Sequence, residues 1–186
     1  MFREDKATAM AVYFLRQDLN HKLNDLTLMK LMVISERECM AKSTSLITGS
    51  RFVSMQNGPV LSDVLNLMKG KTDSALWCKC IEFVPFDGPD SPSNYCRLKS
   101  EIEISDYLSD FEIEILTSVW NSHGAKDKWD LVTLTHEFPE WDKTCEKTKS
   151  SSPISLESIF EFGLETSPCE ARERAQEIEY FEAVSA

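Results

Sequence analysis

Long hydrophobic runs are missing from this 186-residue sequence. No apolar stretch approaches the roughly 20 residues that a helix needs to span a bilayer. The N-terminus, MFREDK, carries acidic residues where a secretion signal would be basic and then apolar. We therefore expect a cytoplasmic protein without a membrane-spanning segment. Its six cysteines are then expected to be reduced thiols.

Basic residues are also few. The chain has 20 Lys and Arg against 31 Asp and Glu, which gives a formal net charge of −11. Such a chain repels nucleic acid and anionic membranes and attracts basic partners. The charge is uneven, because residues 150–186 hold eight acids and only two bases. We expect no nucleic-acid partner, and DNA-binding autoregulation is disfavoured for the same reason.

Histidine occurs only three times, and its most suggestive setting is VTLTHEFPEW, residues 132–141. A zinc protease of the His-Glu-x-x-His kind needs a second imidazole where this chain has Glu140. Pro139 also breaks the helix between His136 and Glu140, so the two side chains are not helical neighbours. We expect His136 to serve a structural role at a helix end, with Trp141 folding back on the helix.

Other catalytic motifs are absent as well. The sequence has no G-x-S-x-G, no phosphate loop and no dinucleotide fingerprint. We expect a protein that is not an enzyme and that uses no cofactor.

Paired Cys-x-x-Cys knuckles are absent too, although Cys78 and Cys80 with Cys96 offer an alternative metal site. On a strand, Cys78 and Cys80 would share one face, and Cys145 or His136 could complete the ligands. The preferred interpretation is that the three cysteines are small strand residues. A metal-dependent hydrolase remains the alternative function, and it would use these cysteines as metal ligands.

The residues that are present indicate a mainly α fold with a small β element, of the α+β class. Apolar residues recur at helical spacing within 7–15, 28–40 and 111–120. Ser109 and Glu112 match a capping box, and Asp127 is expected to cap a further helix that runs to about 138. Residues 51–56 are expected to form a short strand or an extended arm. Two β-prone arms, residues 76–86 and 94–104, flank a Gly- and Pro-rich loop and predict a hairpin. Further helices are expected over 154–164 and after Ser167.

Domain organisation follows from these segments. We expect one compact helical domain over residues 1–149, with the β insertion at about 76–104. The KTKSSSP stretch, residues 147–153, is interpreted as a linker. Residues 150–186 then form an acidic helical extension that packs on the same domain.

Two polar features interrupt this pattern. Gln56-Asn57-Gly58-Pro59 stands at the start of a predicted helix, with Pro59 in its first turn. It could cradle an anion, but a single glycine favours a turn with positive φ. Lys30 interrupts the apolar stripe of the second helix. One interpretation is that Lys30 is a buried, functional lysine. The preferred interpretation is that its aliphatic stem packs on the core while its amine reaches water or a carboxylate.

Two long stretches carry a family resemblance. They are LTLMKLMVISERECMAKSTSLITGSRFVSMQNGPVLSDVLNLM and LSDFEIEILTSVWNSHGAKDKWDLVTLTHEFPEW. Together, over residues 25–141, they resemble the Panacea domain, also called SocA-like. The residues that carry the resemblance, which we expect to be structural, are Lys30, Asn57, Gly58, Pro59, Val60, His136, Pro139 and Trp141.

The resemblance implies a helical antitoxin that binds a cognate toxin protein directly. Toxins beside members of this family include small alarmone synthetases. The resemblance also leaves open an adaptor that delivers a toxin to an AAA+ protease. It does not fix an oligomeric state or the contact residues.

Aromatic anchors outside the resembling stretches are the expected contacts with a partner. We predict Tyr180 and Phe181 first, and Trp77 and Phe86 second.

Overall fold

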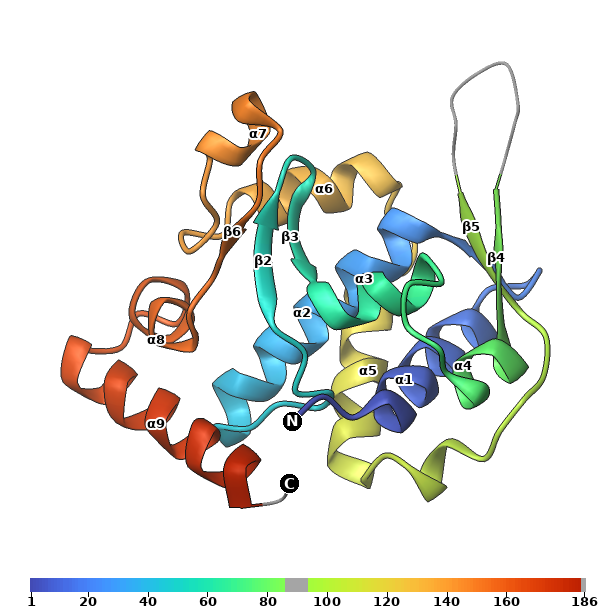
Figure 1. Ribbon diagram of the computed structural model, residues 1–186, viewed down its shortest axis with the longest axis horizontal. Coiled ribbons are helices and arrows are strands. Elements are labelled where there is room, and N and C mark those ends of the chain that lie inside the picture. The colour runs from blue at the N-terminus through green and yellow to red at the C-terminus, as the bar shows by residue number, and fades with distance from the viewer. Residues whose placement is uncertain (86–93, 185–186) are drawn as a thin grey trace.

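The computed structural model describes residues 1–85 and 94–184, and its centre is the long helix α2 (Asp25–Ser43). Helices α1 (Glu4–Gln17), α5 (Asp110–His123) and α6 (Lys128–His136) pack around α2 (Figure 1). Asn24 caps α2 by accepting a hydrogen bond from the Leu26 N–H at 3.0 Å. No helix among the described residues is long and apolar enough to cross a membrane.

The helices predicted from periodicity are confirmed, and their caps explain where they begin. At the start of α5, the Glu112 N–H donates to the Ser109 side chain, and the Ser109 N–H donates back to the Glu112 carboxylate at 2.8 Å. Asp127 caps α6 by accepting from the Trp129 N–H at 2.8 Å. These bonds satisfy backbone donors that a helix start leaves free.

The predicted hairpin is present, but it is shorter than expected and belongs to a three-stranded sheet. Strands β4 (Ile81–Val84) and β5 (Tyr95–Leu98) pair antiparallel, and β1 (Lys22–Asn24) adds to the other side of β5. Residues 76–80 were expected to be extended, and this is wrong, because they belong to α4 (Ala75–Cys80). Ser74 starts that helix by accepting from the Trp77 N–H at 2.9 Å. After β5 the chain leaves the sheet and forms a short 3-10 turn, η1 (Ile104–Asp106).

A second sheet, in the order β3-β2-β6, forms from strands that the sequence only partly indicated. It contains β2 (Phe52–Met55), β3 (Gly58–Leu61) and β6 (Ser152–Pro153). Pro59 was expected in the first turn of a helix, but it lies in β3, and helix α3 (Ser62–Met68) begins after it. The predicted linker is likewise not simply a loop, since it contains the end of α7 (Thr144–Thr148) and all of β6.

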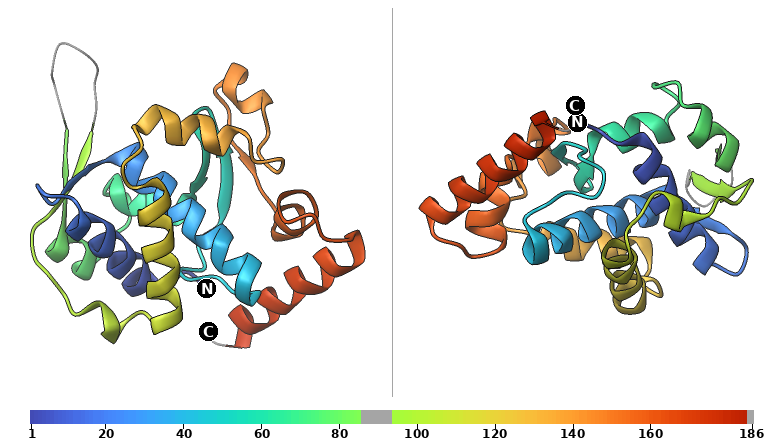
Figure 2. Two further views of the ribbon diagram at one scale, coloured as in Figure 1. Left: turned by 180° about the vertical axis from the view of Figure 1, so that it is seen from behind. Right: turned by 90° about the horizontal axis from the view of Figure 1, so that it is seen from below.

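The C-terminal segment lies at one side of the molecule. It consists of α8 (Leu156–Ser158), a π-helical turn η2 (Ile159–Gly163) and the long helix α9 (Pro168–Val184). Helix α9 packs on α8 and η2, and it buries Ala171, Ala175 and Ile178. In both turned views α9 stays at the edge of the molecule, and its end comes back beside the N-terminus (Figure 2).

Candidate functional site

Three distant segments meet at Gly58, where φ is +90°. A Cβ atom there would lie 2.9 Å from Lys30 Nζ, 2.8 Å from Thr135 Oγ1 and 3.1 Å from His136 Cδ2. Only glycine fits this backbone conformation and this space. We call this contact between α2, the β2–β3 turn and the end of α6 the Gly58 junction. It confirms that Asn57-Gly58 forms a turn that needs positive φ.

Lys30 lies inside the Gly58 junction, and the expectation that its amine reaches water or a carboxylate is wrong. Its side chain has no exposed surface, and Nζ donates to the Pro59 carbonyl at 2.8 Å. Burial lowers the pKa of Lys30 to about 7. The amine therefore ties α2 to β3, and in this conformation it cannot meet a substrate from solvent.

His136 ends α6 and stacks on Trp141, with ring centroids 3.8 Å apart and planes at 11°. Trp141 Nε1 also donates to the Met55 carbonyl at 3.1 Å, which holds the tryptophan against β2. The predicted fold-back of Trp141 is thus confirmed. Burial lowers the pKa of His136, so the ring is mainly neutral near pH 7.

Glu140 and His136 do not form a common site. The chain turns at Pro139 after α6, and Glu140 pairs with Arg37 at 2.7 Å and is almost fully buried. The failure of a His-Glu-x-x-His geometry, expected from Pro139, is confirmed. Val60, another of the resembling residues, is buried opposite Val53 in the β2–β3 ladder.

The alternative cysteine site is not assembled. Cys78 and Cys80 lie on α4 rather than on a strand, so roughly 200° of helix rotation separates their side chains. Cys78 is exposed while Cys80 and Cys96 are buried, and burial raises the pKa of Cys96 to about 12. Across residues 1–85 and 94–184, no three His, Cys, Asp or Glu side chains are grouped to hold a metal ion.

The predicted contact residues have different positions. Tyr180 and Phe181 lie exposed on α9, at 65% and 57%, with their rings edge to face at 5.8 Å. Trp77 is a core residue with 3% exposure, so its assignment to a partner surface is corrected. Phe86 lies outside the described residues. We call Tyr180, Phe181 and nearby Val184 the α9 ridge.

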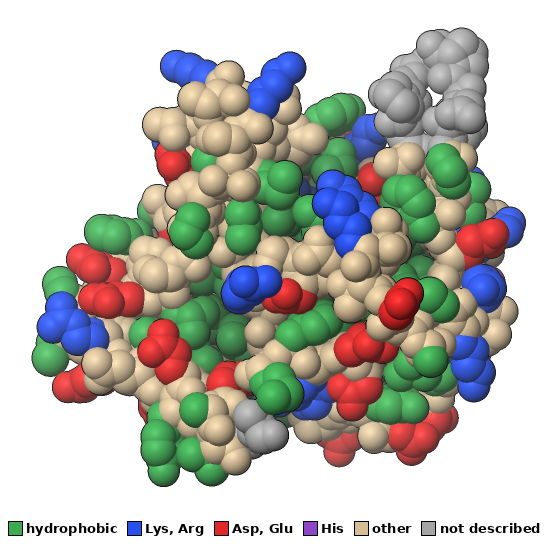
Figure 3. Space-filling view, viewed as in Figure 1, with side chains coloured by type: hydrophobic (Ala, Val, Ile, Leu, Met, Phe, Trp, Pro, Cys, Tyr) green, Lys and Arg blue, Asp and Glu red, His purple; other side chains and the backbone are tan. Residues whose placement is uncertain are grey.

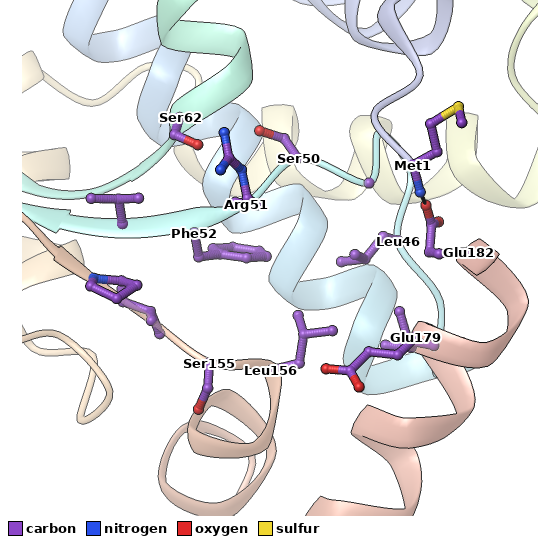
Figure 4. Close-up of a pocket in the computed structure, with 15 residues that line it drawn as sticks. Met1, Leu46, Ser50, Arg51, Phe52, Ser62, Ser155, Leu156, Glu179 and Glu182 are labelled. Atoms are coloured by element: carbon purple, nitrogen blue, oxygen red, sulfur yellow. Dashed lines mark hydrogen bonds and ion pairs between the residues drawn. The ribbon is translucent and has the colours of Figure 1, made fainter. Parts of the chain in front are cut away.

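A cavity of about 580 Å³ lies between the second sheet and α9 (Figure 4). Its apolar lining includes Leu46, Phe52, Val53, Ile154, Leu156 and Ile178. We call it the C-terminal groove. Sequence reasoning did not find it, because its two walls come from segments about a hundred residues apart and neither carries a motif.

Charged groups at the groove are arranged in pairs with one exception. Glu182 binds the N-terminal ammonium of Met1 and approaches Arg3 at 3.4 Å. Arg51, on the opposite rim, binds Asp63 at 3.0 Å. In the part of the chain that the structure describes, Glu179 has no hydrogen-bond or ion-pair partner. Figure 4 shows its carboxylate turned into the groove.

Comparison with known proteins agrees with the resemblance. The family described as "Antitoxin SocA-like, Panacea domain" matches residues 28–142. No curated protein and no solved structure matches the chain. The match covers more than half of the sequence and contains the whole Gly58 junction. The chain therefore belongs to the SocA-like antitoxin family with a Panacea domain.

Proposed function

We propose that this protein is an antitoxin that neutralises a cognate toxin protein by binding it directly. Membership in the family supports a role as an antitoxin. The observation that carries direct binding is the α9 ridge, where two aromatic side chains are more than half exposed next to each other. Exposed aromatic clusters are the usual anchors of protein interfaces.

The charge of the chain indicates the kind of partner. A net charge of −11 suits a toxin with a basic contact surface. Complementary charge mainly accelerates association and selects partners, whereas the buried aromatic contacts supply most of the affinity. We therefore propose that the acidic surface accelerates association with the toxin and that the α9 ridge supplies most of the affinity.

The polar groups of the Gly58 junction support a role without catalysis. Lys30 has no exposed surface and His136 is held between Trp141 and the β2–β3 turn. Both side chains are used to hold α2, the second sheet and α6 together. In this proposal the protein acts through its surface, and the Gly58 junction stabilises the fold that presents that surface.

Co-expression tests the proposal. The toxin is identified as the product of a neighbouring reading frame that arrests growth when it is expressed alone. The wild-type protein is expected to restore growth and to co-purify with that product. The double variant Tyr180→Ala/Phe181→Ala is expected to lose protection while it melts at an unchanged temperature, because both side chains are exposed.

Trp129→Ala is the matched control, since Trp129 is a large aromatic residue with 51% exposure on α6, away from α9. It should protect as well as the wild type. Persistent growth arrest with abundant, folded wild-type protein would exclude direct neutralisation. A fall in toxin level that requires an AAA+ protease would instead indicate an adaptor.

A further inference from the structure

The C-terminal groove has the shape and chemistry of a docking site for a peptide segment. We propose that it binds an apolar segment of the toxin that carries an adjacent Lys or Arg. This inference rests on the direct-binding function proposed above and adds the site and the chemistry of the bound segment. The α9 ridge does not line the groove, so the two would be separate contacts made from the same helix.

The volume and lining of the groove suit apolar side chains. About 580 Å³ is within the range of pockets that enclose a ligand of several side chains. Phe52, Ile154 and Ile178 form a largely buried floor, and half-buried Val53 and Leu156 line the sides. The space-filling view shows hydrophobic side chains gathered in the hollow between the strands and α9, with acidic groups and a basic group at its edge (Figure 3).

Glu179 selects the charge of the docked segment. The other charged groups of the lining are neutralised within the protein, Arg51 by Asp63 and Glu182 by the Met1 ammonium and Arg3. The carboxylate of Glu179 faces the groove without a partner among the described residues. An apolar segment seated there would partly desolvate this charge, which favours a Lys or Arg on the segment.

Hydrogen bonds inside the protein hold the parts of the groove that lie outside α9. Buried Glu36 accepts hydrogen bonds from the N–H groups of Ile47 and Thr48, both at 2.7 Å, and so positions the neighbouring Leu46 wall. The Ile154 N–H donates to the Phe52 carbonyl at 3.0 Å, which joins the floor residues of two segments. A preformed site loses less conformational entropy on binding.

The two walls have different origins in the chain. Leu46, Phe52 and Val53 lie inside the segment that matches the family, whereas Ile154, Leu156 and Ile178 follow it. The groove is therefore completed by the part of the sequence outside the matched domain. This arrangement allows the C-terminal segment to set which partner is recognised.

Charge argues against other occupants. A second copy of this chain would bring another strongly acidic surface against the acidic α9 rim, and like charges at an interface oppose association. Nucleic acid is disfavoured by the same repulsion. A basic, apolar protein segment is the occupant that the groove complements.

Three variants and a defined probe test the groove. The probe is a phage-displayed library of random 12-residue peptides, followed by anisotropy titrations with a labelled synthetic copy of the selected peptide. Val53→Trp fills the groove, and Glu179→Lys reverses its free charge. Glu177→Lys is the matched control, because Glu177 is exposed on α9 and does not line the groove.

Selected peptides are expected to combine apolar residues with Lys or Arg. Binding should weaken by more than about tenfold in Val53→Trp and by roughly three- to tenfold in Glu179→Lys. Glu177→Lys should bind like the wild type. If Val53→Trp does not fold by circular dichroism, Leu156→Trp replaces it, since Leu156 lines the same groove.

Unchanged binding to the filled groove, selection of acidic peptides, or no selection above background would overturn the proposal. So would a dimer of the wild type that Val53→Trp dissociates, because the occupant would then be a second copy.

Growth protection separates the two proposals. Protection by both the wild type and Val53→Trp removes the groove as the toxin site and leaves the antitoxin function intact. No protection by the wild type removes the function itself.

Discussion

At the scale of single residues, Gly58 determines how three parts of the chain meet. The Cβ of any other residue would collide with Lys30, Thr135 and His136, and the backbone there has a left-handed φ. The junction thus depends on the absence of a side chain as much as on the groups around it.

Gly58→Ala is expected to lower the free energy of unfolding by about 1–3 kcal/mol, from the positive φ and the forced shift of its neighbours. Urea unfolding measures this loss. Gly70→Ala is the matched control, because Gly70 also has a positive φ but open space around it. Equal losses in both variants would show that crowding at the junction is unimportant.

Lys30 makes stability depend on pH. Its pKa is about 7 in the folded protein against 10.5 as the ordinary value, so between these values the unfolded chain holds a proton that the folded chain lacks. The contribution of Lys30 to the free energy of unfolding must therefore rise as pH increases from about 7 to 10.5, and it does not change with pH below that range. Between pH 7 and 9 the rise is on the order of 2 kcal/mol.

Replacing this amine isolates its contribution. Lys30→Met keeps a similar volume without the titrating group, so the wild type should gain stability relative to the variant as pH rises from 7 to 9. Urea unfolding at several pH values gives the comparison, with exposed Lys69→Met as the control. Parallel stability curves for wild type and Lys30→Met would contradict the burial of a titrating amine.

At the scale of elements, α9 is attached by a narrow apolar stripe and by the contact of Glu182 with the N-terminus. Most of its other side chains face solvent, including the α9 ridge. An element held in this way opens more readily than a core helix. Its attachment therefore controls both the ridge and one wall of the C-terminal groove.

Glu182→Gln should loosen the end of α9. It removes the charge that binds the Met1 ammonium and Arg3, so amide hydrogen exchange over residues 178–184 is expected to accelerate. Glu177→Gln, on the same helix but without that contact, should exchange like the wild type. Identical exchange in all three proteins would show that the N-terminal contact does not hold α9.

The sequence predicted the elements with strong local signals. Helices α1, α2, α5 and α6 have helical periodicity, and Ser109 and Asp127 mark two of their starts. The signals failed for α4, because its Leu, Trp and Cys residues run directly into the β-prone strand β4, although Ser74 caps a helix. They also failed for β1 and β6, because two or three residues carry no pattern of their own.

The site was predictable only in part. The sequence indicated the turn at Gly58, the break at Pro139 and the return of Trp141, since each depends on local backbone rules. It did not show that Lys30 is enclosed, because enclosure comes from β3 and α6, which are distant in sequence. The C-terminal groove was beyond local reasoning for the same reason.

At the scale of the whole molecule, acidic charge surrounds a scaffold whose polar interior groups are used for structure. A basic toxin should therefore associate faster at low ionic strength. The association rate is expected to fall on the order of tenfold between 50 and 500 mM salt, with a smaller change in dissociation. Stopped-flow mixing measures both rates, and an association rate independent of salt would contradict charge steering.

The central claim is that this protein works by occupying a partner and performs no reaction on it. Titration of purified toxin activity with purified antitoxin, without protease and with only the substrates that the toxin itself needs, tests it most directly. The account predicts that toxin activity falls linearly and reaches zero at a fixed molar ratio. Complete loss of toxin activity at a small fraction of that ratio, with continued turnover, would contradict it.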